Sequence, residues 1–376
     1  GTLTNGNQQP FRLGESMARV ASSSSESTIL GISPIRRDTA PVGSAPARRG
    51  RRLWRLFFRL LAASFLALTA ACQDPVGTTD RSPATDDEFD SGSLIADQTP
   101  TTIQIQNLAL LGKVWGFAKY HHPRVVGGEH HWDYELFRVV PSVLAASDRM
   151  AAAGAIVTWL DGLGSIQECS SCVQPPSQAH LQAEIGWIDD VAYLGAELSS
   201  RLQSMHRNRP ASGAHRYVSF YPNVGNPDFS QESRYAGHSA PDAGYRLLAL
   251  FRFWNIIQYW FPYRDVMAEN WDAVLTEFIP IVLGPMDGDE YRLAMIRLTG
   301  RVHDTHANLW GELHLRPPVG DEEVPVLLRF VEGKPVVFGY SHDQLGPATG
   351  LQVGDEIHRI DGVAVETLID SLTPYY

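Results

Sequence analysis

The stretch LGKVWGFAKYHHPRVVGGEHHWDYELFRVVPSVL, residues Leu111 to Leu144, recurs once in this chain of 376 residues. The second copy, LFRFWNIIQYWFPYRDVMAENWDAVLTEFIPIVL, covers Leu250 to Leu283 and lies 139 positions later without a gap. Ten of the 34 positions are identical, and chance is a poor explanation for that, so we predict a duplicated structural unit. The identical pairs are Leu111/Leu250, Trp115/Trp254, Tyr120/Tyr259, Pro123/Pro262, Trp132/Trp271, Asp133/Asp272, Leu136/Leu275, Pro141/Pro280, Val143/Val282 and Leu144/Leu283.

Each copy predicts the same series of helices. A helical stretch runs to a turn marked by proline, and a second helix then begins at Trp-Asp. A further helix is expected over 151–160 and, in the second copy, over 289–299. Two copies are too few for a solenoid, so we expect a helical region of two small bundles, 101–210 and 245–316. The apolar residues with a 3.6-residue period in the second helix are Leu136, Val139, Val140 and Val143.

The residues between the two copies form two different pieces. Residues 181–205 carry an apolar stripe at helical spacing and predict one helix. Residues 211–244 form a connector, in which the run YVSFY at 217–221 reads as a strand. A loop rich in Pro, Asn, Asp and Gly follows that run.

Two histidine pairs in the first copy, 121–122 and 130–131, resemble a metal cluster at first sight. The second copy argues for another interpretation, because Trp260 and Phe261 stand where the first copy has the pair 121–122. We therefore expect an aromatic slot that is filled by a ring, and we predict no metal site there.

A further histidine pattern, His303-Asp304-Thr305-His306, is not part of the repeated scaffold, because residues 164–167 of the first copy read Gly-Ser-Ile-Gln. Two imidazoles three residues apart with a carboxylate would bind a metal or orient a base. The alternative, which we favour, is a capped helix end with His306 bonded to the backbone. Residues 308–315 then read as a strand.

The segment 317–376 changes from helical to strand patterning. Residues 324–330 and 336–340 read as two strands with a turn between them. The run ATGLQVGDEI at 348–357 follows, and then Ile-Asp-Gly at 360–362. We expect a short helical turn to end at Gly350, where only glycine adopts a left-handed backbone cheaply.

Two further features complete the expected local structure of this segment. Asp361-Gly362 is a type I′ hairpin signal. Residues 366–372 predict a helix with one apolar face.

These residues resemble a bacterial PDZ domain in the circularly permuted arrangement of extracytoplasmic proteases. The resemblance implies that a peptide C-terminus binds by strand addition, in a groove between the strand 327–330 and the helix 366–372. The peptide carboxylate would meet backbone N–H groups near Val326 and Leu327. Core packing is the alternative role of the apolar strand residues. The motif residues are Gly350, Leu351, Gly354, Asp355, Ile357 and Gly362, and the implied peptide-binding residues are Val326, Leu327, Leu328, Phe330, Leu368 and Leu372.

The order of segments over 107–376 is similar to the N-terminal half of the tail-specific (C-terminal processing) serine peptidases, the tricorn-like group. The resemblance implies an α+β fold, with a duplicated helical N-terminal region followed by a circularly permuted PDZ-type β domain that is incomplete at its C-terminus. It also implies a catalytic α/β domain after the PDZ domain. None of the family's catalytic residues maps onto this chain, and no cofactor is implied. We therefore expect an inactive N-terminal fragment that recognises peptide or protein C-termini.

The N-terminal residues predict export. Six arginines precede the apolar run 60–71, which is too short for the ~20 residues of a membrane span and is typical of a signal peptide. Small residues before Cys72 resemble a bacterial lipobox, so a lipid on Cys72 would anchor the chain to the membrane of the cell envelope. Thr69 stands where leucine is usual, so simple cleavage is the alternative. We expect 1–47 to be disordered upstream sequence, 48–72 the signal and 73–100 a flexible tether.

The charge and the cysteines bound the remaining functions. The net charge is −11 overall and −18 after residue 71, which argues against nucleic-acid binding. The pair Cys169 and Cys172 could form a local disulfide, a redox pair or half of a metal site, and we expect a disulfide or two free thiols. Without a second pair a four-thiolate zinc site is excluded.

Two other functions remain open from the sequence. The chain would be a membrane-tethered peptide adaptor without catalysis, or a metalloenzyme that uses His303, Asp304 and His306. The sequence does not determine the oligomeric state or the identity of the substrate.

Overall fold

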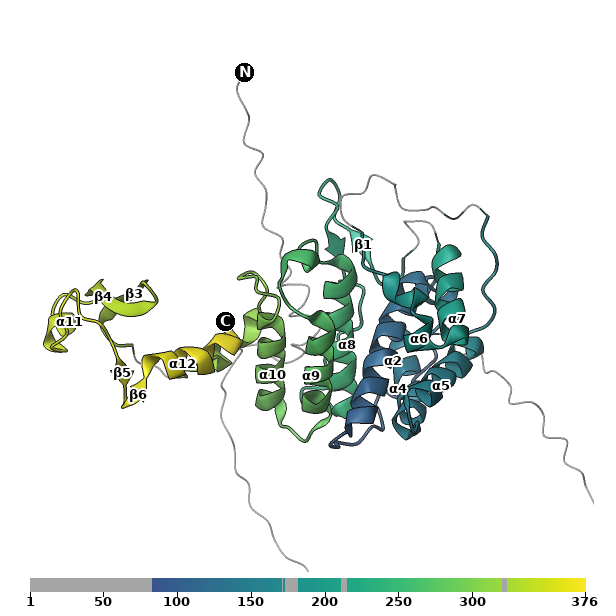
Figure 1. Cartoon of the computed structure of the whole chain (residues 1–376), viewed down its shortest axis with the longest axis horizontal. Helices are drawn as coiled ribbons and strands as arrows, with labels where there is room; N and C mark the ends of the chain where they lie inside the picture. The colour runs from purple at the N-terminus through teal and green to yellow at the C-terminus, as the bar shows by residue number, and fades with distance from the viewer. Residues whose placement is uncertain (1–82, 171, 173–181, 211–214, 320–322) are drawn as a thin grey trace, which may run out of the picture. The chain divides into compact units, whose positions relative to one another are not determined.

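The computed structural model describes residues 83–170, 172, 182–210, 215–319 and 323–376 (Figure 1). The predicted upstream segment 1–47, the export signal 48–72 with Cys72, and residues 73–82 of the predicted tether lie outside the described residues. The described fold is α+β, because helices dominate it and its strands form short antiparallel pairs.

The expected helices of both copies are present. The helices predicted at 151–160 and 289–299 are confirmed as α5 and α10. The first copy comprises α2 (Thr102–His121), α3 (Pro123–Val126), α4 (Trp132–Ala145) and α5 (Arg149–Gly162). The second comprises α8 (Ala243–Trp260), the 3-10 turn η2 (Arg264–Val266), α9 (Trp271–Leu283) and α10 (Gly288–Gly300).

The helix caps extend the sequence match beyond the ten identities. Asp148 and Asp287, again 139 positions apart, are the N-cap residues of α5 and α10. Each carboxylate accepts a hydrogen bond of 2.9 Å from the backbone N–H three residues later. Such a cap satisfies one of the free N–H groups at a helix start. An aspartate therefore caps α5 and α10 in the same way.

The paired tryptophans form the same arrangement in each copy. Trp115 and Trp132 each donate an indole N–H to the other's carbonyl oxygen, at 3.1 and 3.2 Å. Trp254 and Trp271 do the same at 2.7 and 3.0 Å. The two rings of each pair lie within 13° of parallel, and all four are buried. The first pair therefore holds α2 against the start of α4, and the second pair holds α8 against the start of α9.

The two copies meet where α2 crosses α8. A Cβ atom on Gly116 would lie 1.8 Å from the side chain of Asn255, and one on Gly112 would lie 2.7 Å from the ring of Phe251. Asn255 also donates a 3.0 Å hydrogen bond to the carbonyl of Gly112. The sequence spacing pairs Gly112 with Phe251 and Gly116 with Asn255, so equivalent positions face each other across this crossing.

The charged residues beside this crossing exchange partners between the copies. Lys113 on α2 binds Asp272 of the second copy at 3.1 Å, and Arg252 on α8 binds Asp133 of the first. Lys113 and Arg252 are equivalent positions 139 apart, as are Asp133 and Asp272. Such reciprocal pairing is the pattern of an isologous two-fold contact, formed here within one chain.

The prediction of a flexible tether is wrong for residues 83–100. Phe89 and Ile95 are buried in the helical core, and Asp86 and Ser93 are buried as well. The hydroxyl of Ser93 donates a 2.6 Å hydrogen bond to Asp242, the N-cap residue of α8. The segment is polar in composition, but two apolar anchors and specific polar contacts are enough to hold it on the body.

The predicted helix over 181–205 is interrupted. It is divided into a 3-10 turn η1 (Gly186–Asp189), a short α6 (Val191–Leu194) and α7 (Ala196–Arg207). Gly195 separates the last two with φ of 78°, a left-handed value that glycine adopts readily and that ends α6.

Two strand predictions also changed. The run 217–221 is reduced to β1 (Ser219–Phe220), which pairs antiparallel with β2 (Pro227–Asp228). The strand predicted over 308–315 is wrong, because this segment forms the 3-10 helix η3 (Trp310–Leu315).

The C-terminal lobe contains short strands and helical turns. Its elements are β3 (Val326–Val331), β4 (Lys334–Tyr340), α11 (Leu345–Ala348), β5 (Arg359–Ile360), β6 (Val363–Ala364), α12 (Val365–Leu372) and the 3-10 turn η4 (Thr373–Tyr375). β3 pairs with β4, and β5 pairs with β6, both antiparallel. The turns use Glu332-Gly333 and Asp361-Gly362, all with φ between 49° and 80°, which agrees with the two-residue hairpin expected at 361–362.

Among the described residues, none of the helices has the length and apolar character needed to cross a membrane.

Candidate functional site

The outer edge of β3 is open in the C-terminal lobe. β4 pairs with β3 on one side, and on the other side it forms a bridge between Val336 and Glu356. β4 is therefore the inner strand, and among the described residues no strand pairs with the outer edge of β3. An edge strand presents unpaired N–H and C=O groups to which an extended peptide can add.

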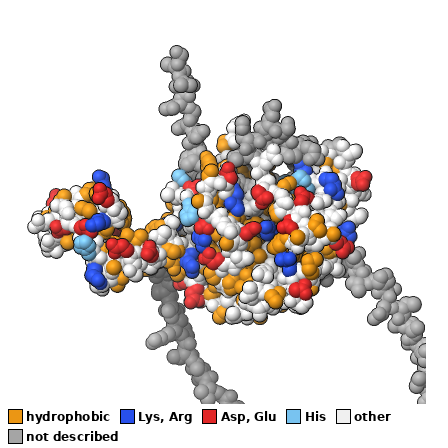
Figure 2. Space-filling view, viewed as in Figure 1, with side chains coloured by type: hydrophobic (Ala, Val, Ile, Leu, Met, Phe, Trp, Pro, Cys, Tyr) orange, Lys and Arg blue, Asp and Glu red, His pale blue; other side chains and the backbone are white. Residues whose placement is uncertain are grey.

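The apolar side chains of β3 face solvent. Phe330 is 61% exposed and Leu328 is 43% exposed, and Leu327 and Val331 are exposed too. Core packing, the alternative role for these residues, therefore does not describe them. Figure 2 shows hydrophobic side chains at the surface of this lobe. Leu328 pairs directly with Val337, the fully buried residue of β4, so Leu328 and Phe330 extend the apolar face that begins at Val337.

The other predicted groove residues lie on α12 and at the start of β3. Leu368 and Leu372 are half-buried, and α12 lies in the chain directly between β6 and η4. The N–H of Val326 is already bonded to the carbonyl of Val324 at 2.8 Å, so it is not free to receive a carboxylate. A groove between β3 and α12 stays a prediction.

The motif residues shape the segment that is bonded to the other side of β4. Gly350 and Gly354 have φ of 82° and 102°, as the turns at these positions require. Gly354 donates to the carbonyl of Val337 at 2.8 Å, and Ile357 donates to that of Pro335 at 2.9 Å. The carboxylate of Asp355 accepts a 2.8 Å bond from the N–H of Gln352 and closes the turn.

Leu351 and Gly362 complete the set. The carbonyl of Leu351 accepts a 2.8 Å bond from the Tyr340 hydroxyl. Gly362 lies in the hairpin turn between β5 and β6. Together these motif residues build the frame that supports β4 and, through β4, the open strand β3.

A buried ionic cluster joins the helical copies to the connector. Lys119 on α2 binds Glu232, and Arg252 on α8 binds both Asp133 and Glu232, the latter at 3.2 Å. The hydroxyl of Tyr235 donates to Asp133 at 2.6 Å. All four charged side chains are almost completely buried. Sequence reasoning missed Lys119 and Glu232, because neither belongs to a recognisable motif.

The charges in this cluster support each other. Burial works against the charged form of Arg252, but Asp133 and Glu232 outweigh it and raise its pKa. Burial also opposes ionisation of Asp133, yet Arg252 and Lys119 hold its pKa below the usual value. Burial lowers the pKa of Lys119. No substrate can reach groups buried to this degree, so we assign the cluster a structural role.

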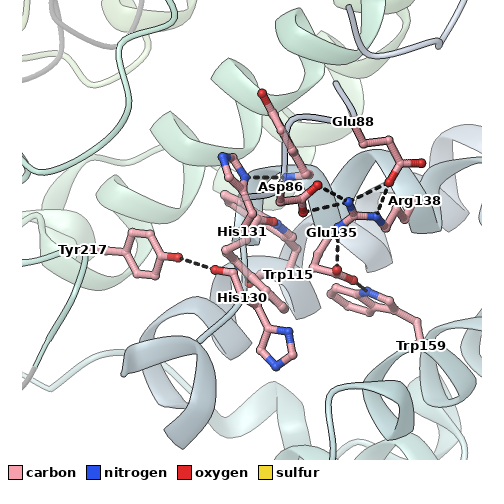
Figure 3. A network of polar contacts seen from close by, with 11 residues as sticks. Asp86, Glu88, Trp115, His130, His131, Glu135, Arg138, Trp159 and Tyr217 are labelled. Carbon is pink, nitrogen blue, oxygen red and sulfur yellow. Dashed lines mark hydrogen bonds and ion pairs between the residues drawn. The ribbon is translucent and has the colours of Figure 1, made fainter. Parts of the chain in front are cut away.

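A second ionic cluster holds the segment before α2. Arg138 on α4 binds both oxygens of Asp86 at 2.7 Å, and it also binds Glu88 and Glu135 at 2.7 Å each (Figure 3). Trp159 on α5 donates its indole N–H to Glu135 at 3.1 Å. The guanidinium of Arg138 therefore joins residues 86–88 to α4, and Glu135 extends the network to α5.

The histidines of the first copy lie in aromatic surroundings. His121 stacks on Phe117 with ring centroids 4.2 Å apart, and His131 stacks on Tyr134 at 3.6 Å. Burial lowers the pKa of His121 to about 3 and that of His122 to about 4, so both rings are neutral at pH 7. The carbonyl of His130 accepts a bond from Tyr217 (Figure 3).

The two histidines of the pattern 303–306 contact different carboxylates. The Nε2 atom of His303 lies 3.5 Å from Glu269, while Nδ1 of His306 lies 3.2 Å from the carboxylate of Asp304. The favoured interpretation was wrong in one detail, because the His306 ring is bonded to a side chain and not to the backbone. Within the part of the chain that the structure describes, no three metal-ligating side chains converge.

The cysteine pair forms a disulfide between Cys169 and Cys172, with Cα atoms 5.4 Å apart. The backbone N–H of Cys169 donates to Asn208, the C-cap residue of α7, at 2.8 Å. This loop disulfide therefore lies beside the end of α7.

Searches for related proteins found no family model, curated protein or solved structure that matches this chain.

Proposed function

We propose that this chain recognises polypeptide C-termini as the N-terminal, substrate-selecting part of an exported tail-specific serine endopeptidase. The C-terminal lobe would bind the end of the substrate by adding it as a strand to β3. In this proposal the chain binds the substrate, and none of its residues catalyses hydrolysis. The PDZ-like string over 348–362 supports it, together with the order of segments along the chain.

One observation carries the proposal: within the described part of the chain, β3 has an open edge and an exposed apolar face. Unpaired backbone groups on an edge strand give affinity, and alternate side chains give specificity. Leu328 and Phe330 lie on one face of the hairpin with Val337, so a peptide added to β3 would place its own apolar side chains beside them. Natural proteins usually protect such an edge, which makes an uncovered one a functional candidate.

The helical region would support this lobe. We infer that its two halves arose by duplication, because ten identical positions are accompanied by the same tryptophan pairing and by reciprocal ion pairs. We also propose that the chain is exported and anchored through a lipid on Cys72, as the basic and apolar residues before it suggest.

Peptide binding tests the proposal. The full chain would be titrated into a fluorescent peptide that ends in three apolar residues with a free carboxylate, and into the same peptide as a C-terminal amide. We expect the free acid to bind at least about tenfold more tightly, and we expect neither peptide to be cleaved.

Two matched substitutions locate the site. Phe330 and Phe338 are similarly exposed, but they lie on opposite faces of the hairpin. Burial of a large apolar side chain contributes about 1.5–3 kcal/mol, so Phe330→Ser should weaken binding by about 10–100-fold. Phe338→Ser should leave binding unchanged. Equal binding of acid and amide, or equal effects of the two substitutions, would refute the proposal.

A further inference from the structure

A groove of about 600 Å³ lies on the helical body, away from β3 in the sequence and outside the site described above. It runs between the β1–β2 hairpin and the end of α8 with the turn that follows it. One wall is aromatic and consists of Phe220, Tyr259, Trp260 and Phe261. Glu184 and Asp265 also belong to its lining.

The two rings at the centre of this wall form a notch. Trp260 and Phe220 have centroids 5.8 Å apart and planes inclined at 57°. Trp260 is held in place by edge contacts with Tyr120 at 5.4 Å and with Phe229 at 6.1 Å. Phe220 is 48% exposed, so its ring is available to a ligand. Inclined rings accept a ridge, such as a proline ring, whereas a sugar would need a flat platform.

The helical scaffold does not require this notch. The first copy has His121 and His122 at the positions of Trp260 and Phe261. His122 is buried there, and His121 is stacked against Phe117. The same helix end therefore carries histidines in one copy and borders a groove in the other.

The polar residues of the groove select the charge of a ligand. Arg264 donates to Gln258 at 3.2 Å, and Gln258 in turn donates to the carbonyl of Glu184 at 3.3 Å. Gln258 is neutral, so Arg264 keeps its positive charge, and the two carboxylates of the lining exceed it by one. The exposed side chains of Glu184 and Asp265 give the mouth a negative charge. A neutral or basic ligand is favoured over an acidic one.

We propose that this groove binds an extended, proline-containing peptide segment of neutral or basic character, independently of any free C-terminus. The segment would adopt the polyproline II conformation, which is extended before binding and therefore loses little entropy on entering an aromatic groove. The inference takes its substrate class, a polypeptide, from the proposed function. It adds a second contact to an internal segment of the substrate.

The probe is a fluorescent peptide of alternating proline and leucine with one arginine, acetylated at its N-terminus and amidated at its C-terminus. Blocked ends prevent any contribution from carboxylate recognition at β3. We expect the full chain to bind it, with a change in the intrinsic tryptophan fluorescence. An analogue with glutamate in place of arginine should bind at least about fivefold more weakly. No binding of the blocked peptide would overturn the inference.

Matched variants locate the contact. Phe220→Ser should weaken binding by about tenfold or more, while Phe338→Ser, a phenylalanine of similar exposure outside the groove, should not. Glu184→Gln with Asp265→Asn should weaken only the arginine peptide. Equal effects of Phe220→Ser and Phe338→Ser would contradict the inference, as would complete displacement of the peptide by a chitin tetrasaccharide.

The two proposals fail separately. Loss of blocked-peptide binding with retained binding of the free-acid peptide would refute the groove and leave the proposed function intact. The reverse result would refute carboxylate recognition at β3 and retain a peptide-binding groove.

Discussion

The exchanged ion pairs offer a comparison of one interaction in two environments. Asp133 and Asp272 occupy equivalent positions in the first turns of α4 and α9, and each binds a basic residue of the other copy. The Asp133 side chain is almost completely buried against Arg252, whereas that of Asp272 is 62% exposed beside Lys113. The perturbation is Asp133→Asn in one variant and Asp272→Asn in another.

The two substitutions should cost different amounts of stability, because the Asp133 pair is buried and the Asp272 pair is exposed to solvent. Removing one partner of a buried pair leaves an uncompensated buried charge and costs about 3–5 kcal/mol. Glu232 lies 3.2 Å from Arg252 and remains, so we expect the lower end of this range for Asp133→Asn, about 3 kcal/mol. An exposed pair is worth about 0–1 kcal/mol, which we expect for Asp272→Asn. Both residues lie in a helix first turn, so the loss of about 0.3–1 kcal/mol from the helix dipole is common to both variants.

Urea unfolding followed by tryptophan fluorescence measures the difference, because Trp115, Trp132, Trp254 and Trp271 are buried in the body. The pKa of Asp133 is held below its usual value in the folded protein, so its stabilising effect is present above about pH 4 and is lost as the pH falls through the folded pKa. The difference between the two variants in unfolding free energy should therefore become smaller below pH 4. Equal losses at pH 7, or a loss below about 1 kcal/mol for Asp133→Asn, would refute the reasoning.

Two further predictions concern the helical body. His121 has a pKa of about 3 in the folded protein against about 6.5 unfolded, so the unfolded chain binds its proton first and stability falls as the pH drops. His121→Phe should therefore remove about 2 kcal/mol of the stability lost between pH 7 and pH 5 in urea titrations, and an unchanged pH profile would contradict this. Gly116→Ala should destabilise by about 1–3 kcal/mol because its Cβ would overlap Asn255, while Gly154→Ala, with open space around it, should stabilise by about 0.5–1 kcal/mol. Thermal unfolding compares the two glycine variants. A higher unfolding temperature for both would contradict the close contact of α2 and α8 at Gly116.

The helices were predictable because their signals are local. Apolar periodicity, caps and glycine turns act within a few residues, which explains why α5, α10 and the hairpin at 361–362 agree with expectation. Local pattern failed where a distant partner decided the outcome. The segment 308–315 has the spacing of a strand, but it forms a 3-10 helix whose buried Glu312 lies 3.7 Å from Arg292 on α10.

The polar composition of residues 83–100 was misleading for the same reason. The segment lacks enough apolar surface to fold alone, yet Arg138, about fifty residues away in the sequence, binds Asp86 and Glu88. Phe89 finds its place against Tyr134 and Phe137, with ring centroids 5.4 Å from each. Composition describes the segment in isolation, whereas its order depends on partners from elsewhere in the chain.

The sequence by itself determined the repeat of 139 residues, the helices within it and the turn glycines of the C-terminal lobe. Only the tertiary structure showed that Asp133 and Asp272 each pair with a basic residue of the other copy, and that Trp260 borders a groove. The physical reason is the range of the forces involved. Backbone conformation and periodicity act along the chain, but burial, charge pairing and the shape of a groove depend on which distant residues are brought together.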